Sequence, residues 1–447
     1  MTDRLLVIGG DAAGMSAAAQ ARRLRTDLRI TVLEQGPDVS YSACGIPYWV
    51  GDVVGDRDQL IARTPAEFAE RDIDVRLHTR AESIDLAAGT VRTSSGETLG
   101  YDRLVVATGG RPARPDVPGL DADGVHGVHR LADGASLRAA IAAGARRAVV
   151  LGGGYIGLEM AEVLVGRGLD VTVVLADPLP MAQLDDDMGE RVCAALGALG
   201  VTVRPDEPVV EIEVDADGAA RAVRTSGGSY PADLVVLGLG MGPEARLAET
   251  AGLALGPTGG IEVDRTQRST SHPEVSAAGD CSQTFSRITG APMHVALGTH
   301  ANKQGRVAGS VIAGRPARFP GVLGTAITKV GDTEIALTGL CTTAAEQAGY
   351  DHVTESVEGT TRAGYYPGAA DLAIKLISER GSGLLLGAQI VGGPGSGKRI
   401  DVFATAIWAG LTAEELAGSD LSYAPPFSPV YDPVLVAARA VSRIEQG

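Results

Sequence analysis

Two segments of the sequence share one pattern, in which a short apolar run leads into a cluster of glycines and then into residues that favour a helix. The first is Leu5–Gly10 followed by DAAGM, and the second is Arg147–Leu151 followed by GGGYIGLE, with Gly152, Gly154 and Gly157. A strand, a glycine turn and a helix in this order begin a βαβ unit, whose helix N-terminus offers main-chain N–H groups to the pyrophosphate of a dinucleotide. Two copies predict two dinucleotide-binding units in one chain.

The first of these two turns is incomplete. Its glycines are Gly9, Gly10 and Gly14, and Asp11 stands at the second glycine of the G-x-G-x-x-G motif. Taken alone, the turn is explained equally well as an ordinary glycine turn. The β-branched run that follows ends at Glu34, twenty residues after Gly14, which is where a dinucleotide-binding unit places its acid for the ribose hydroxyls. Together with the second copy, this acid favours a dinucleotide site.

The second unit does not decide between NADH and NADPH. The strand predicted over residues 170–174 is followed by Leu175, where an acid is expected, with Asp177 nearby. No cluster of arginines follows to bind a 2′-phosphate. The choice of nucleotide therefore stays open.

The composition narrows the class of protein. A chain of 447 residues with 45% apolar content can bury more than one core, and a net charge of −16 argues against a nucleic-acid surface, which needs clustered Lys and Arg. No apolar run reaches the roughly 18 residues of a membrane helix, and no secretory leader precedes the first strand. Four scattered cysteines form neither a zinc pattern nor a disulfide framework. We expect a multi-domain cytoplasmic protein without a metal site, a nucleic-acid partner or a membrane span.

One of the four cysteines, Cys44, is a candidate nucleophile. It lies in the sequence SYSACGIPY, and a helix N-terminus, a cation or an electron-accepting cofactor lowers the pKa of such a thiol. A two-cysteine reductase would carry the second cysteine at position 49, which is Trp49, so a disulfide of Cys44 must form with an outside thiol. The alternative for Cys44 is a buried, inert thiol. The other three cysteines are expected to be structural, namely Cys193, Cys281 and Cys341.

Further turns and a change of pattern complete the layout. The apolar runs that end at Thr108–Gly109 and at Gly238–Gly240 are candidates for chain crossings between two nucleotide domains, and Asp280 follows small residues at a turn. Each of these is by itself more often a loop than a ligand site. From about Gly321 onwards, strand-like and helical segments end in a proline-rich stretch, which indicates a separate α+β domain.

In this order, the motifs make the sequence similar to the flavin-dependent pyridine nucleotide-disulfide oxidoreductases, and it most resembles their single-cysteine branch, near coenzyme A-disulfide reductase. The motifs span essentially the whole chain: GGDAAGM, SYSACGIPY, ATGGRP, GGGYIGLE, AAGDC, LGTHANKQGRVAG, GVLGTAITKV, AGYYPGA, KRIDVFATAI and YAPPF. The resemblance implies an α/β fold with two Rossmann-like domains, for FAD and NAD(P), and a C-terminal α+β dimerisation domain. The FAD domain is expected over residues 1–112 and 243–320, the NAD(P) domain over 113–242 and the dimerisation domain over 321–447.

The resemblance also implies a role for each motif. The residues expected to bind FAD are Gly9, Gly14, Glu34, Thr108, Gly109 and Asp280. Those expected to bind NAD(P)H are Gly152, Gly154, Gly157, Tyr155 and Glu159, with Tyr155 covering the face of the flavin that receives the nicotinamide. Cys44 is expected to alternate between a thiolate and a mixed disulfide or sulfenate.

Departures from the family motifs bear on the subclass. The oxidases and peroxidases carry a histidine where this chain has Ala12, and glutathione-type reductases use a C-terminal histidine, whereas no histidine follows His352 here. Coenzyme A-disulfide reductases instead use tyrosines that the partner subunit contributes from its C-terminal domain. The tyrosines at matching positions are Tyr365, Tyr366 and Tyr423, and a further one is replaced by Phe427.

We therefore predict an FAD-dependent homodimer that uses NAD(P)H to reduce coenzyme A disulfide, or a related low-molecular-weight disulfide or persulfide, through Cys44. Arg22, Arg23 and Arg25 lie on the first helix. Of these, Arg22 and Arg23 are expected to bind the substrate together with Ser40, the alternative being a solvated helix face. Two other functions stay open, an NAD(P)H oxidase that cycles Cys44 through a sulfenate and a flavoprotein redox sensor that a partner reads.

The motif LGTHANKQGRVAG and its surroundings contain two more pairs of residues with predicted roles. One of His294 and His300 is expected to contact the flavin. Lys303 and Arg306 are expected to be packing or interface charges rather than catalysts.

Overall fold

The computed structural model describes residues 3–446 and separates the chain into two compact units. Unit 1 comprises the residues up to Ile46, together with Val54–Ala113 and Met241–Val322. Unit 2 comprises Pro47–Val53, Arg114–Gly240 and the residues from Leu323 onwards. The three domain ranges predicted from the sequence stay predictions, and residues 1, 2 and 447 of those ranges lie outside the described residues.

Unit 1 is built on a five-stranded parallel sheet with the order β18-β7-β1-β2-β3. The central strand β1 buries four of its five residues, because helices and loops cover both faces of a parallel sheet. This strand order is that of a doubly wound nucleotide-binding sheet, whose ligands bind at the carboxyl ends of the strands. The strands are β1 (Arg4–Ile8), β2 (Arg29–Leu33), β3 (Ile73–Arg76), β7 (Arg103–Val106) and β18 (Val275–Ala277).

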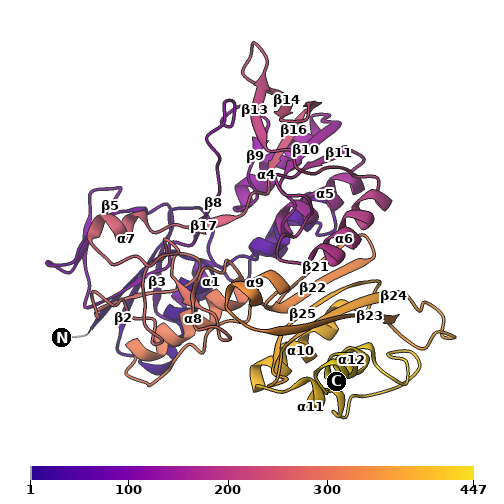
Figure 1. Cartoon of the computed structure of the whole chain (residues 1–447). Coiled ribbons are helices and arrows are strands. Elements are labelled where there is room, and N and C mark those ends of the chain that lie inside the picture. The colour runs from indigo at the N-terminus through magenta and orange to yellow at the C-terminus, as the bar shows by residue number, and fades with distance from the viewer. Residues whose placement is uncertain (1–2, 447) are drawn as a thin grey trace. The chain divides into compact units, whose positions relative to one another are not determined.

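Two helices of unit 1, α1 (Ala12–Leu24) and α8 (Gly298–Ile312), pack closely against each other (Figure 1). A Cβ on Gly305 would lie 2.2 Å from the carbonyl oxygen of Ala13. The small residues therefore allow α8 to approach the main chain of α1 directly.

The remaining elements of unit 1 are short. A second, antiparallel sheet contains β4 (Ala81–Asp85), β5 (Thr90–Thr93) and β6 (Thr98–Gly100), and α7 (Arg246–Ala251) packs against β4. Two-stranded ladders pair β8 (Gly110–Pro112) with β17 (Met241–Pro243) and β19 (Thr284–Phe285) with β20 (Pro292–Met293). The other helical turns are η1 (Ala43–Gly45), η2 (Arg57–Leu60) and α3 (Pro65–Ala69).

Unit 2 contains a second five-stranded parallel sheet, with the order β12-β11-β10-β16-β9. Its strands are β9 (Val125–His126), β10 (Arg147–Leu151), β11 (Asp170–Val174), β12 (Thr202–Arg204) and β16 (Leu234–Leu237). The helices of this part are α2 (Ile46–Val50), which starts at the last residue before unit 2, α4 (Leu131–Ala142), α5 (Tyr155–Gly166) and α6 (Asp186–Ala198). A small antiparallel sheet is made of β13 (Val209–Val214), β14 (Ala220–Thr225) and β15 (Ser229–Pro231).

The C-terminal part of unit 2 is an antiparallel sheet with the order β21-β22-β25-β24-β23, next to helices (Figure 1). Its strands are β21 (Ala326–Val330), β22 (Thr333–Gly339), β23 (His352–Thr360), β24 (Asp371–Glu379) and β25 (Leu385–Gly392). Its helices are α9 (Thr342–Gln347), η3 (Gly397–Arg399), α10 (Ile400–Ala409), α11 (Ala413–Ala417) and α12 (Pro433–Gln446).

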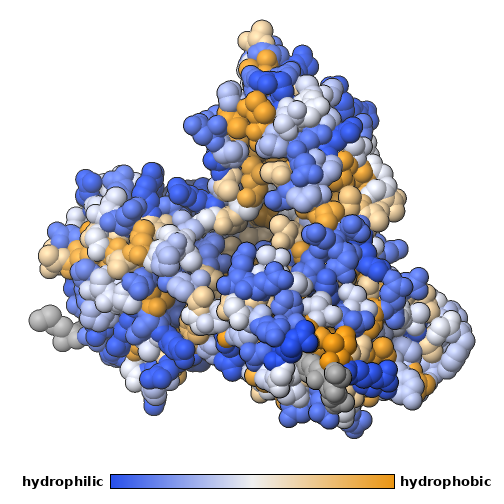
Figure 2. Space-filling model, viewed as in Figure 1, coloured by the Kyte–Doolittle hydropathy of each residue, from blue (hydrophilic) through white to orange (hydrophobic). Residues whose placement is uncertain are grey.

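The fold class predicted from the sequence is confirmed, since two parallel sheets of the dinucleotide-binding type are followed by an α+β region. The face seen in Figure 2 shows mainly hydrophilic residues interrupted by small apolar patches. Among residues 3–446, no helix combines the length and the apolar character that crossing a membrane requires.

Candidate active site

The first glycine turn joins β1 to α1 and leaves space only for glycine at two positions. Gly9 has a φ of +106°, and a Cβ there would lie 2.0 Å from the carbonyl oxygen of Ala107. A Cβ on Gly14 would lie 2.0 Å from the carbonyl oxygen of Gly9. The first turn of α1 contains no acidic residue, and no side-chain hydrogen bond caps the helix. Its N-terminus therefore offers N–H groups to an anion such as a pyrophosphate.

Two carboxylates flank this turn at the ends of two strands of the same sheet, β2 and β18, which lie on opposite sides of β1. Glu34 follows β2 and accepts hydrogen bonds from the N–H groups of Gly10 (2.8 Å) and Gly36 (2.7 Å), which leaves a second lone pair on each oxygen for ribose hydroxyls. Asp280 comes shortly after β18, burial raises the pKa of its carboxyl, and within the described residues this carboxylate has no hydrogen-bond partner. A partly buried acceptor without a partner fits the hydroxyl-rich chain of FAD.

The turn after β7 is fixed by main-chain and side-chain hydrogen bonds. Thr108 Oγ1 donates to the carbonyl oxygen of Glu244 at 2.5 Å, and Gly109, with a φ of +75°, accepts from the N–H of Glu244 at 3.0 Å. Thr108 and Gly109 thus hold the segment that precedes α7 at the carboxyl end of the sheet. This position fits the predicted cofactor role of both residues, which stays a prediction.

The second glycine turn, between β10 and α5, repeats the geometry of the first. Gly152 has a φ of +96°, and a Cβ on Gly157 would lie 2.0 Å from the carbonyl oxygen of Gly152. A Cβ on Gly154, by contrast, would meet no atom within 4 Å, and Gly154 precedes α5 without any side-chain cap. The open space beside Gly154 and the uncapped helix fit the pyrophosphate of NAD(P)H.

Two titratable side chains lie on α5 directly after this turn. Burial raises the pKa of Tyr155, so its phenol stays protonated. Burial also raises the pKa of Glu159 to about 7, which the nearby Glu162 supports and the hydrogen bond from Thr328 Oγ1 (3.3 Å) opposes. A carboxyl with a pKa near 7 in such a place is typical of a functional site.

The position that decides between nucleotides carries no acid. Leu175 is buried, and a Cβ on Gly153 would lie 2.6 Å from its Cδ2, so the leucine packs beneath the glycine turn. Ala176 and Asp177, which follow it, are exposed. The preference for NADH or NADPH therefore stays open, as the sequence predicts.

Cys44 lies in η1, within a loop of unit 1 that is held from two sides, and it is exposed. On one side, the N–H of Ser40 donates to the carbonyl oxygen of Gly10 (2.9 Å) and the N–H of Tyr41 donates to Asp11 Oδ1 (3.3 Å). On the other side, the N–H of Ser42 donates to the carbonyl oxygen of Leu60 (2.8 Å). The exposure of Cys44 argues against the alternative of a buried, inert thiol.

A cavity of about 390 Å³ opens in unit 1 beside this loop. Ser40 and Arg23, both predicted to bind the substrate, are two of its lining residues, and their substrate role stays a prediction. The wall also includes Arg63 and Arg306, for which no substrate role is predicted, so three arginines line one space. The other polar residues in its wall are Ser16, Gln20 and Asn302. Three arginines around one cavity supply the positive charge and the N–H donors that suit a ligand with several phosphates.

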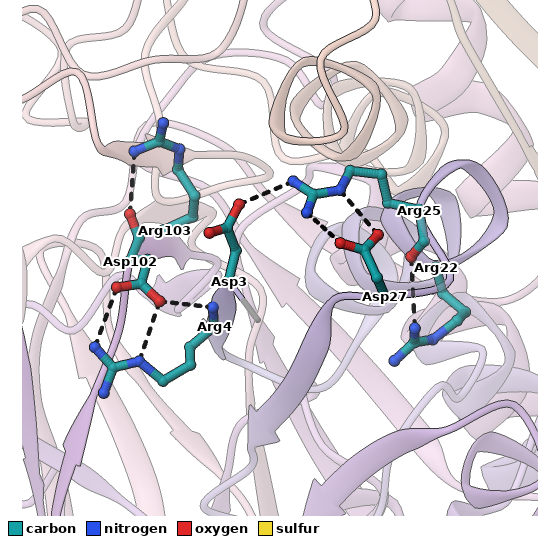
Figure 3. A network of polar contacts seen from close by, with 7 residues as sticks. All are labelled: Asp3, Arg4, Arg22, Arg25, Asp27, Asp102 and Arg103. Carbon is teal, nitrogen blue, oxygen red and sulfur yellow. Dashed lines mark hydrogen bonds and ion pairs between the residues drawn. The ribbon is translucent and has the colours of Figure 1, made fainter. Parts of the chain in front are cut away.

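Arg22, in α1, and Arg25, directly after its last residue, make other contacts (Figure 3). The Arg22 guanidinium donates to main-chain carbonyls, among them those of Thr26 and Leu28 at 2.6 Å and Asp72 at 2.7 Å, and it is not part of the cavity wall. Arg25 forms ion pairs with Asp3 (3.0 Å) and Asp27 (2.6 Å). We therefore drop Arg22 from the substrate site, because its donors already hold the C-terminal end of α1.

The three predicted catalytic tyrosines come together in the C-terminal region of unit 2. Tyr365 and Tyr423 share a hydrogen bond, and burial together with this bond raises the pKa of Tyr423. Arg399 holds both segments, since its guanidinium donates to the carbonyl oxygens of Thr361 (2.8 Å) and Phe427 (2.9 Å). Tyr366 follows Tyr365 and, like it, is exposed. The motifs AGYYPGA and YAPPF therefore form one aromatic surface, and their catalytic role stays a prediction.

The other cysteines and the two histidines are placed as follows. Cys281 is buried, whereas Cys193 and Cys341 are partly buried. His294 donates from Nε2 to the carbonyl oxygen of Asp280 at 2.8 Å, so it supports the residue predicted to bind FAD. Burial lowers the pKa of His300 to about 4, and its Nδ1 is buried without a partner among the described residues.

The residues that the sequence did not identify are Arg63 and Arg306. Arg306 was expected to be a packing or interface charge, whereas it lines the cavity. Arg63 lies in none of the motifs identified in the sequence. The helical spacing offered the only signal for Arg306, since Asn302 and Arg306 are four residues apart and share one face of α8.

Comparisons with known proteins give matches over most of the chain. Residues 3–305 match the sequence model of the pyridine nucleotide-disulphide oxidoreductase family, and residues 325–433 match that of its dimerisation domain. An NAD(P)H coenzyme A polysulfide/persulfide reductase from Pyrococcus horikoshii is 36% identical over 99% of both chains. An NADH oxidase from Methanocaldococcus jannaschii is 37% identical over 97% of this chain and 98% of its own. The solved structure of an NAD-dependent persulfide reductase from A. fulgidus superposes with a TM-score of 0.95 at 40% identity, covering 99% of this chain and 84% of that one.

Proposed function

The chain belongs to the pyridine nucleotide-disulphide oxidoreductases, which use FAD and NAD(P)H, and from this premise we propose that it reduces coenzyme A disulfide, or a related low-molecular-weight disulfide or persulfide, through Cys44. The observation that carries the proposal is the cavity beside the Cys44 loop. Ser40 belongs to both the loop and the cavity wall, and Arg23, Arg63 and Arg306 supply the charge that the phosphates of coenzyme A require. The name of the Pyrococcus horikoshii relative, which includes coenzyme A, supports the same substrate class.

The proposed chemistry starts at the exposed Cys44 thiolate, which attacks one sulfur of the substrate disulfide. A bond forms between Cys44 Sγ and that sulfur, the disulfide breaks, and the departing thiolate takes up a proton. FAD, when bound, supplies the two electrons, drawn from NAD(P)H, that reduce the mixed disulfide. The second thiol then leaves and Cys44 returns to the thiolate. One cycle consumes NAD(P)H, one proton and one disulfide and releases NAD(P)⁺ and two thiols.

In this proposal, residues of the chain bind the cofactors and donate the proton that the departing thiolate needs. The turn at Gly9 and Gly14, together with Glu34 and Asp280, binds and orients FAD, and the turn at Gly154 does the same for NAD(P)H in this proposal. Tyr423 of the partner subunit gives a proton to the departing thiolate. The raised pKa of Tyr423 keeps this phenol protonated at neutral pH, as a proton donor must be.

A homodimer is part of the proposal, because the dimerisation-domain match covers residues 325–433. The aromatic surface of that region is exposed in the single chain, with Tyr365 at 78% and Phe427 at 74% of full exposure. Aromatic residues exposed in this number typically meet a partner. A second copy of the chain is the partner that the family match supports.

The cavity arginines are tested by comparing two disulfides under anaerobic conditions. Arg23→Ala and Arg306→Ala raise the KM for coenzyme A disulfide about tenfold or more each, because each removes a charge-assisted contact to phosphate of about 1.5 kcal/mol or more. The KM for pantetheine disulfide, which lacks the adenosine phosphates, stays within twofold. Arg318→Ala, an exposed arginine outside the cavity, leaves both KM values unchanged. Equal losses for both disulfides would contradict the assignment of the cavity.

Oxygen reduction is the second candidate, because the Methanocaldococcus jannaschii relative is named an NADH oxidase. The absence of a histidine at Ala12 disfavours it. Oxygen consumption with NADH and with NADPH, measured against disulfide turnover in the same preparation, separates the two. A faster rate with oxygen than with every disulfide tried would favour the oxidase.

A further inference from the structure

Asp11 occupies a place in the first glycine turn where the dinucleotide-binding motif has a glycine. It is the residue before α1, yet its carboxylate caps no N–H of the second or third helical residue. Instead, Asp11 Oδ1 accepts a hydrogen bond from the N–H of Tyr41 at 3.3 Å, three residues before Cys44. The side chain is therefore tied to the redox loop, and this tie keeps the carboxyl within the turn.

The surroundings of Asp11 contain other acids. The pKa of its carboxyl is raised to about 6, mainly by burial and also by the charges of Glu34, after β2, and Asp280, after β18. The N–H groups of Tyr41 and Ala12 lower it, and within residues 3–446 Asp11 forms no ion pair. His294 contacts the main chain of Asp280. On α8, which packs against α1, Lys303 is a cation, and His300, with a pKa of about 4, is neutral near pH 7.

FAD brings the two negative charges of its pyrophosphate to this same turn. An ionised Asp11 would face those charges at short range in a partly buried site, where repulsion is weakly screened. A protonated Asp11 carries no charge and has one O–H donor, which a phosphate oxygen accepts, while its other oxygen still accepts from Tyr41. The neutral form is thus the one compatible with a bound pyrophosphate.

We propose that FAD binding at the first glycine turn takes up one proton at Asp11, so that the protein holds FAD less tightly as the pH rises. The linkage is reciprocal, because a charge that raises the affinity of Asp11 for a proton must itself bind better to the protonated protein. This property belongs to the cofactor site and does not depend on which disulfide the enzyme reduces.

The ionisation of Asp11 determines the direction in which the Kd for FAD changes with pH and the pH range over which it changes. Below about pH 6, Asp11 is protonated with or without FAD, no proton is exchanged, and the Kd for FAD does not change with pH. Above that pH the FAD-free protein is ionised and must gain a proton on binding. The Kd then rises tenfold per pH unit, until the pH exceeds the pKa that Asp11 has in the complex.

The test measures FAD release from the full-chain holoenzyme between pH 5.5 and 8.5. The enzyme is diluted serially, and the fluorescence of free FAD gives the Kd at each pH. For the wild-type protein the Kd rises about tenfold from pH 7 to pH 8. In Asp11→Asn, which keeps the shape without the charge, the Kd stays constant within twofold over the whole range. Asp58→Asn, which removes an exposed carboxylate elsewhere in unit 1, keeps the wild-type slope.

Asp11→Gly restores the motif glycine and provides a second variant if Asp11→Asn does not fold, and it too is expected to give a constant Kd. A wild-type Kd that does not change with pH overturns the proposal, and so does a slope that persists in both variants. Neither readout involves disulfide turnover. Failure here therefore leaves the proposed function untouched, and the loss of that function leaves this proposal testable.

Discussion

The sequence alone identifies some residues of the candidate site, whereas others are assigned only from the structure. Cys44 was identifiable because a lone cysteine in SYSACGIPY has few other uses, and the structure adds that it is exposed in a loop held by Gly10, Asp11 and Leu60. Arg22 and Arg23, by contrast, are neighbours of the same type, and only the structure separates them. One residue along a helix turns a side chain by about 100°, which directs Arg22 to carbonyl groups and Arg23 to the cavity.

At the same scale, Glu159 predicts a pH-dependent stability. Its pKa is about 7 in the folded protein against an ordinary 4.5, so the folded state holds the proton more tightly than the unfolded state. The free energy of unfolding therefore falls as the pH rises from about 4.5 to 7, where the unfolded state alone is ionised, and levels off above 7. Glu159→Gln removes this loss and raises the stability at pH 8 by about 1–3 kcal/mol relative to the wild type.

Thermal unfolding of both proteins at pH 5 and pH 8 checks this expectation. The difference in Tm between Glu159→Gln and the wild type should be larger at pH 8 than at pH 5. Glu190→Gln, which removes an exposed carboxylate of α6, serves as the control and should show no gain at pH 8. A Tm difference that is the same at both pH values would show that Glu159 does not carry the titration.

At the scale of elements, the strands and the glycine turns were predictable because their signals are local. The first two strands appear within a residue or two of the expected runs, and both glycine turns have the backbone geometry that excludes a Cβ at Gly9, Gly14 and Gly157. The contact between α1 and α8 was not predictable, because residues 12–24 and 298–312 lie far apart in the sequence. The cavity could not be foreseen either, since its wall combines residues of α1, the Cys44 loop, the loop at Arg63, α3 and α8.

The close contact of α8 with α1 predicts that small substitutions in α8 have unequal effects. Gly305→Ala places a Cβ 2.2 Å from the carbonyl oxygen of Ala13, so the helices must separate, and the stability falls by about 1–3 kcal/mol. Gly298→Ala, in the same helix, meets no atom within 4 Å and serves as the matched control. Thermal unfolding should give a clearly lower Tm for Gly305→Ala only. Equal Tm values for the two variants would mean that the packing of α8 on α1 is looser than described.

At the scale of the whole molecule, the sequence predicted the order of the two dinucleotide-binding sheets and the C-terminal α+β region, and the family match agrees with it. The partner subunit belongs to the proposed homodimer. The sequence indicates it through the motifs AGYYPGA and YAPPF, and the structure indicates it through exposed aromatic side chains at Tyr365, Phe427 and Tyr431.

A charge placed on this aromatic surface is expected to separate the dimer. Phe427→Glu introduces a carboxylate at a side chain that is 74% exposed in the single chain and, in the proposed dimer, buried. Light scattering after size-exclusion chromatography should show monomers, and disulfide turnover should fall in proportion to the dimer lost. Val53→Glu, at an apolar side chain of 73% exposure outside the dimerisation region, should remain a dimer. Full turnover by a monomeric protein would contradict the role of Tyr423 across the subunits.

The central claim is that Cys44 carries the electrons to the substrate, and anaerobic turnover with coenzyme A disulfide tests it most directly. NADH and NADPH oxidation and the release of free thiol are followed together for the wild type, Cys44→Ser and the control Cys193→Ser. We predict two thiols per nicotinamide oxidised for the wild type and the control, and a loss of at least about a thousandfold for Cys44→Ser, in which the nucleophile and its mixed disulfide are both absent. Undiminished thiol release by Cys44→Ser would contradict the account.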